Sequence, residues 1–157
     1  MKSIIVCKSV SHGNTRKVAE TIGEVLDARV VDPADIEPEE LSEYRLVGFG
    51  SGVRHMNYYP ELREFVQGLP KDQRAKAFVF NTSGFPQPPF IPYRDKFVRL
   101  VEDRGFDVVD TFTCFGYDTY LPLRVVGGVR KGHPNSADLD TARAFARQLR
   151  NRVEAAD

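Results

Sequence analysis

The loop that follows the first apolar run of the chain is rich in small polar residues. Residues 4–6 are β-branched and apolar, which indicates a buried strand, and the apolar spacing from Val18 to Leu26 indicates an amphipathic helix. A helix that begins directly after such a loop presents main-chain N–H groups and a positive partial charge, which suit a phosphate. The candidate ligands of this anion are Ser9, Ser11, His12, Gly13, Asn14 and Thr15. The same residue types would also serve an N-capped turn without a ligand.

Strand and helix patterns alternate along the whole chain. We expect strands at 3–8, 29–32, 45–50, 76–81 and 107–115, helices at 14–27, 59–68, 92–104 and 137–152, and a turn or short helix near 35–43. Such alternation predicts an α/β fold with a parallel sheet covered by helices on both faces. In a sheet of this kind ligands bind at the carboxyl ends of the strands.

Two further loops at that edge have a composition that suits a flat, polar-edged ligand. Small residues come first in each loop and aromatic residues follow, in segments 50–60 and 81–90. Glycines allow the main chain to approach a ring closely, and aromatic side chains can cover it. The candidate ligands in these loops are Ser51, Gly52, Val53 and Arg54, and Thr82, Ser83, Gly84 and Phe85. Turn formation and packing are the alternative roles of the same residues.

Length, charge and cysteine content narrow the class of protein. A chain of 157 residues predicts one domain spanning residues 1–157. The 22 basic and 22 acidic residues give no net charge, so a basic nucleic-acid footprint is not expected. No apolar stretch approaches the roughly 20 residues of a membrane span, and Met1-Lys2 leads directly into a strand, which predicts a cytoplasmic protein. Cys7 and Cys114 lie in apolar runs and are expected to be reduced core thiols.

The segment Ser9-Val10-Ser11-His12-Gly13-Asn14-Thr15 resembles the phosphate loop of the flavodoxin family, with His12 as one extra residue. Gly50-Ser51-Gly52 and Thr82-Ser83-Gly84 stand where flavodoxins hold the flavin ring, and the pattern of the last helix also matches. The resemblance implies a three-layer α/β/α sandwich with a five-stranded parallel sheet in the order 2-1-3-4-5. It also implies FMN as the cofactor.

This sequence lacks the motifs that define other protein classes with a similar α/β architecture. The acidic cluster of receiver domains, the phosphatase Cys and Arg spaced around a loop, the Gly-Lys-Ser/Thr of P-loops and the dinucleotide Gly-x-Gly-x-x-Gly are all absent, although Asp32 ends the second strand. No Cys, His or carboxylate cluster has the spacing of metal ligands.

Three roles remain open for a flavodoxin-like protein. The first is an electron carrier that docks on a redox partner protein. The second is an NAD(P)H-dependent reductase of quinones or other small acceptors, and the third is a binding scaffold without cofactor. Positive charge at Arg54 and His55 would favour the reduced flavin, whereas the same arginine could simply be solvated. Segment 116–136 is long and apolar, which predicts packing on the protein body, on the flavin edge or on a second subunit.

Overall fold

The computed structural model describes residues 1–9, 13–83, 90–115 and 134–156. Within these ranges the strands are β1 (Ser3–Lys8), β2 (Ala28–Val31), β3 (Leu46–Arg54), β4 (Asn57–Tyr58), β5 (Lys76–Ser83) and β6 (Asp107–Phe115). The parallel strands pair in the order β2-β1-β3-β5-β6, and β4 pairs with the end of β3 in antiparallel fashion. The helices are α1 (Asn14–Leu26), α2 (Pro60–Gln67), α3 (Tyr93–Asp103) and α4 (Ser136–Ala155), with two 3-10 helices at Pro33–Asp35 and Pro38–Glu43.

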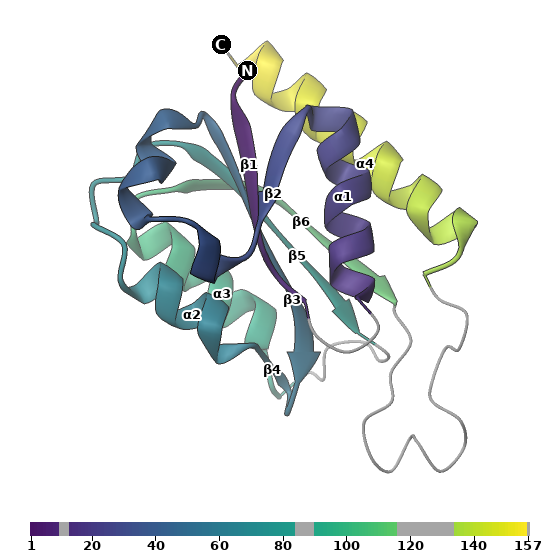
Figure 1. Ribbon diagram of the computed structural model, residues 1–157, viewed down its shortest axis with the longest axis horizontal. Coiled ribbons are helices and arrows are strands. Elements are labelled where there is room, and N and C mark those ends of the chain that lie inside the picture. The colour runs from purple at the N-terminus through teal and green to yellow at the C-terminus, as the bar shows by residue number, and fades with distance from the viewer. Residues whose placement is uncertain (10–12, 84–89, 116–133, 157) are drawn as a thin grey trace.

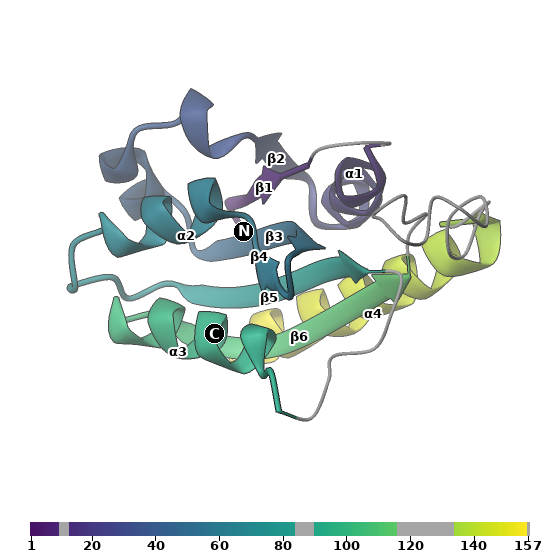
Figure 2. The same ribbon diagram turned by 90° about the horizontal axis from the view of Figure 1, so that it is seen from below.

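Helices cover both faces of the sheet. α1 and α4 lie side by side on one face, and α2 and α3 lie on the other (Figures 1 and 2). Each face has its own apolar core because successive side chains of a strand point to opposite sides. On β5, for example, Val79 packs toward α2 and α3, whereas Phe78 and Phe80 pack toward α1 and α4. The three-layer α/β/α architecture that the sequence predicts is confirmed.

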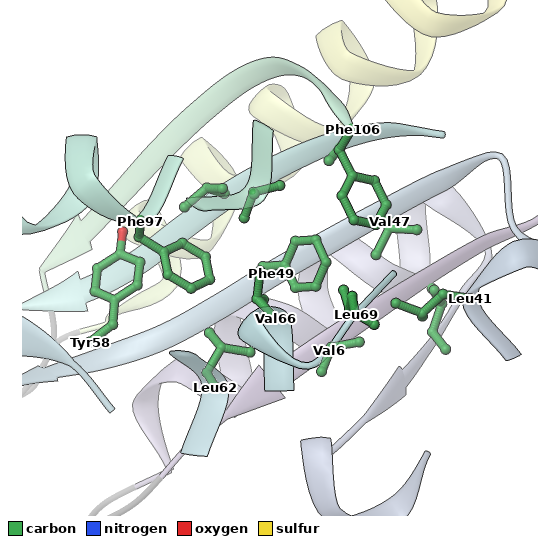
Figure 3. Packing of buried hydrophobic residues seen from close by; sticks show 14 of the residues in the cluster. Val6, Leu41, Val47, Phe49, Tyr58, Leu62, Val66, Leu69, Phe97 and Phe106 are labelled. Atoms are coloured by element: carbon green, nitrogen blue, oxygen red, sulfur yellow. The ribbon is translucent and has the colours of Figure 1, made fainter. Parts of the chain in front are cut away.

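Aromatic rings fill the core between the sheet and the α2–α3 layer. Phe49 lies edge-on to Phe97 and Phe106, with ring centroids 6.2 and 5.4 Å away (Figure 3). Tyr58 packs beside Phe97, at a centroid distance of 4.9 Å. These contacts fix the position of β3 and of the short β4 relative to α3.

The predicted elements agree closely with the structure except at the ends of the third and fourth predicted strands. The fourth strand, β5, continues to Ser83 instead of ending at residue 81, so Thr82 and Ser83 belong to the strand and not to the expected loop. β3 continues through Ser51 and Gly52 to Arg54 instead of ending near residue 50, because Val53 and Arg54 pair with Tyr58 and Asn57. The expected loop after this strand is therefore a strand end and a tight hairpin. The strand order matches the predicted 2-1-3-4-5 when the two-residue β4 is left out of the numbering.

Two glycines of β3 accommodate phenylalanine rings of the neighbouring strand. A Cβ atom at Gly48 would lie 2.3 Å from the ring of Phe78, and one at Gly50 would lie 2.1 Å from the ring of Phe80. Each glycine is also the register partner of that phenylalanine on β5. We expected Gly50 to let the main chain approach a bound ring, but the structure gives it a packing role inside the sheet.

The two cysteines are free and buried, as predicted. Burial raises the pKa of the Cys7 thiol to about 12, and the nearby Arg16 only partly opposes this shift. Such a thiol is neutral at physiological pH and serves as a small apolar side chain. Among the helices that the structure describes, none is both long and apolar enough to cross a membrane.

Substitution of Gly50 by Ala should destabilise the protein by about 1–3 kcal/mol or more, since the added methyl group overlaps the Phe80 ring. Urea denaturation measures the loss. Gly68→Ala is the matched control, because its Cβ would meet main-chain oxygens at 3.5 and 3.6 Å in an ordinary helical conformation. The control should change the free energy of unfolding by less than about 1 kcal/mol. Equal effects of the two substitutions would contradict the packing role of Gly50.

Candidate functional site

The start of α1 forms one side of the site. Gly13 precedes the helix in a left-handed conformation (φ 69°), and no side chain at this position caps the helix. Among the described residues, no atom beyond the chain neighbours of Gly13 would lie within 4 Å of a Cβ atom placed there. Across the first turn, the Ser9 hydroxyl accepts a hydrogen bond from the main-chain N–H of Arg16, at 3.1 Å. The positive end of α1 thus lies beside a space that none of the described residues fills, with the Ser9 hydroxyl at its border.

A buried contact joins this helix start to the end of β5. The hydroxyl oxygens of Thr15 and Thr82 lie 2.6 Å apart, and the two residues are 3% and 5% exposed. Gly52 on β3 completes the contact: a Cβ atom there would lie 3.4 Å from the Thr15 hydroxyl and 3.1 Å from the Tyr59 ring. The ends of β3 and β5 therefore meet the beginning of α1 at one point of the carboxyl edge, at the lower side of the sheet in Figure 1.

The hairpin after β3 places the next candidate residues. Ser51 is fully buried, and its hydroxyl donates to the Gly52 carbonyl and accepts from the Tyr59 N–H. Val53 packs against the core, whereas Arg54 is exposed and its Nε donates to Nε2 of His55 at 3.2 Å. Ser51 thus has a structural role at the base of the hairpin, and Arg54 presents a cation at its tip.

The hairpin turn consists of two residues in the left-handed region. His55 has φ 52° and Met56 has φ 59°, the backbone geometry of a tight two-residue turn. Glycine or asparagine usually occupies these positions because other side chains are strained there. The residue types therefore gave no turn signal in the sequence.

Polar residues at the end of β5 alternate between the two layers. Thr82 faces α1, whereas Asn81 and Ser83 face α3. Asn81 is 1% exposed, and its Oδ1 accepts hydrogen bonds from the Tyr58 hydroxyl at 2.8 Å and, at 3.4 Å, from Thr113. The predicted site residue Ser83 bonds with the hydroxyl of Tyr93 at the start of α3.

Arg94 extends this network toward the surface. Its Nη1 donates to the Thr113 hydroxyl at 2.7 Å. Burial raises the pKa of Tyr58, and it also raises the pKa of Tyr93, where the bond with Ser83 partly offsets it. No sequence pattern predicted this network, although the polar Asn81 directly after the apolar run Ala77–Phe80 was a signal that could have indicated it.

The side chain of Asp32, the acidic residue directly after β2, makes two structural contacts. Its Oδ1 accepts a hydrogen bond from the Ala34 N–H at 2.9 Å, and its Oδ2 lies 3.5 Å from Nζ of Lys8 at the end of β1. The acidic residue at the end of β2 thus caps a 3-10 helix and pairs with a lysine.

Several predicted residues lie outside the described part of the chain. These are Ser11, His12, Gly84 and Phe85, and also segment 116–133. Asn14 is the first residue of α1. Five of the described site residues lie together around the start of α1: Ser9, Gly13, Thr15, Gly52 and Thr82. The side chains of Ser51 and Ser83 point to the α2–α3 side of the sheet. Arg54 lies at the tip of the hairpin, away from this group.

The residues present fit the phosphate of a cofactor in chemical terms. Main-chain N–H groups at a helix start and nearby hydroxyls form a donor set for an anion, and no described residue fills the space beside Gly13. Among the residues that the structure describes, no group of three or more His, Cys, Asp or Glu could hold a metal ion.

Comparison with known proteins identifies the family. The sequence profile described as flavodoxin domain matches residues 4–116, which include β1, β3 and β5 with the site between them. The chain belongs to the flavodoxin family. It is 34% identical over 149 residues to an uncharacterized protein of Methanocaldococcus jannaschii, a match that covers 95% of this chain and 98% of the relative.

Solved structures show the same fold at low sequence identity. Oxidised flavodoxin 1 from Bacillus cereus superposes with a TM-score of 0.70 at 17% identity, covering 96% of this chain and 98% of that one. Rubredoxin oxygen:oxidoreductase from Desulfovibrio gigas gives a TM-score of 0.69 at 16% identity over 98% of this chain, which corresponds to 36% of the larger protein. At sequence identities of 16–17%, the two structures show a shared fold and nothing more.

Replacement of Tyr58 by Phe should lower the free energy of unfolding by about 1–3 kcal/mol, because the buried Asn81 oxygen loses its short hydrogen bond. Urea denaturation of the two proteins gives the difference. Tyr44→Phe serves as control, since the partner of Tyr44 is the exposed Arg29 at 3.3 Å, which water can hydrate. The control should lose about 0–1 kcal/mol. A loss no larger for Tyr58→Phe than for Tyr44→Phe would contradict the importance of the buried network.

Proposed function

We propose that this protein binds FMN at the carboxyl ends of β1, β3 and β5 and transfers electrons to a redox partner protein. The observation that carries the proposal is the flavodoxin-domain match over residues 4–116, which spans all three strand ends. The contact between Thr15 and Thr82 supports it, because it holds the start of α1, which follows β1, against the end of β5.

The start of α1 would bind the phosphate. Main-chain N–H groups of Gly13, Asn14 and Thr15 are the expected donors, because a helix start attracts an anion without a metal ion. Ser9 lies at the border of this space, and Ser11 and His12 adjoin it in the sequence. Neutral overall charge places no long-range barrier against a dianionic ligand.

The ring would lie between the hairpin after β3 and the segment after β5. Gly52, Val53 and Arg54 would border one side. Ser83, Gly84, Phe85 and the main chain of Thr82 would border the other, since the Thr82 side chain faces Thr15 of α1. Ser83 would contribute its main chain, because its side chain is bonded to Tyr93. When bound, FMN accepts and releases electrons through its ring system.

Charge near the ring would set the direction of the redox equilibrium. The exposed Arg54 is hydrogen-bonded to His55 on the hairpin, so that this corner carries a cation. A cation near a ring that becomes negative on reduction stabilises the reduced form. The protein would therefore hold its flavin at a higher potential than a strongly acidic carrier.

We propose one flavodoxin-like domain over residues 1–157 that works in the cytoplasm, binds no nucleic acid, and meets a partner protein or a second copy near the exposed ring edge. The balanced charge of 22 basic and 22 acidic residues suits contact with partners of either sign.

Absorbance spectroscopy of the purified protein tests the proposal. We expect flavin bands, or their shift when FMN is added to protein stripped of ligand, with one FMN per chain released on denaturation. Rapid mixing with NADH or NADPH then separates the redox roles: slow bleaching that a separate reductase accelerates indicates a carrier, and rapid unaided bleaching indicates a reductase. A colourless protein that binds no FMN at micromolar concentrations would contradict the proposal.

A further inference from the structure

The hydroxyl groups of Thr15 and Thr82, which join α1 to β5, together have two protons that can be donated in hydrogen bonds. Each hydroxyl has one proton to donate and can also accept. The oxygens of Thr15 and Thr82 lie 2.6 Å apart, and either one could be the donor. One proton is used in this contact, so the pair keeps one proton for an outside acceptor.

We propose that Thr82 is a positioning residue for the phosphate site, whose hydroxyl donates to Thr15 Oγ1 and leaves the proton of Thr15 for an oxygen of the ligand phosphate. The inference rests on the proposed FMN function. It assigns Thr82 a role different from ring contact, because Thr82 would act on the phosphate through Thr15.

The position of the two residues decides the direction of donation. Thr15 is the second residue of α1, at the positive end where an anion would bind. Thr82 lies within the sheet, opposite Gly52 on one neighbouring strand and Cys114 on the other, and neither of these offers a side-chain oxygen. An anion near α1 would attract the nearer proton, that of Thr15, and the proton of Thr82 would then turn to Thr15.

Burial makes the orientation of the pair specific. Both residues are almost fully buried, and Gly52 lies against Thr15, where a Cβ atom would be 3.4 Å from its hydroxyl. Water therefore has little access to replace the Thr82 hydroxyl. In a buried site a hydroxyl that is itself accepting a hydrogen bond is also the better donor.

The test compares FMN with riboflavin, which has the same ring and no phosphate. Fluorescence quenching gives the dissociation constants for the unchanged protein, Thr82→Val, Thr82→Ser, Thr15→Val and the double variant Thr15→Val/Thr82→Val. Valine keeps the shape and strand preference of threonine, and serine keeps the hydroxyl. Thermal melting of each protein without flavin reports whether it is folded.

We expect Thr82→Val to weaken FMN binding about 2- to 13-fold, the effect of one net hydrogen bond, with riboflavin binding unchanged. Thr82→Ser should restore FMN affinity. In the Thr15→Val background, Thr82→Val should cause no further loss, since Thr82 acts through Thr15.

Three results would overturn the inference. These are an equal loss of FMN and riboflavin affinity in Thr82→Val, an unchanged FMN affinity, and additive losses in the double variant. An unchanged protein that binds neither flavin would refute the proposed function itself, and the role of Thr82 would be refuted with it. A folded variant that still binds riboflavin shows that the flavin site is intact, so a failed prediction for Thr82 can be told apart from a failure of the proposed FMN function.

Discussion

The hydrogen bond between Thr15 and Thr82 holds the start of α1 against the end of β5, and the geometry of the candidate site depends on it. The two residues are 67 positions apart in the chain. Parallel pairing brings them to one edge of the sheet, since all strands of such a sheet end on the same side. Gly52 on the intervening β3 lies against the pair: a Cβ atom there would touch the Thr15 hydroxyl at 3.4 Å and would crowd the Tyr59 ring at 3.1 Å.

The side chains at the end of β5 form hydrogen bonds with both helical layers of the fold. Thr82 bonds toward α1, while Asn81 and Ser83 bond toward Tyr58 and Tyr93 on the opposite face. Strand alternation dictates this division, because consecutive side chains leave opposite faces. The segment after β5 consequently begins from a strand end that is fixed on both sides. A cofactor held there would meet a preformed edge, which reduces the ordering cost of binding.

The sequence predicted the elements and the fold class that follow from the spacing of buried apolar residues. β1 and α1 have apolar residues at the periods of a strand and a helix, so their bounds and the α/β class followed directly. β4 was missed because a two-residue strand has no period and because His55 and Met56 are unusual residues for a tight turn. Gly50 looked like a ligand-facing glycine, yet it packs on Phe80, and only the register of β3 with β5 reveals this contact. The bond between Tyr58 and Asn81 likewise depends on tertiary proximity that no local pattern encodes.

The proposed function requires main-chain amides at the start of α1 to bind the phosphate of the cofactor. Amide resonances in two-dimensional nitrogen–proton NMR spectra measure this directly when the ligand-free protein is titrated with FMN and, separately, with riboflavin. We expect the amides of Gly13, Asn14 and Thr15 to shift strongly with FMN and little with riboflavin, while amides near Gly52 and Thr82 respond to both. Binding of FMN that leaves the amides of Gly13 to Thr15 unshifted would contradict phosphate binding at the start of α1.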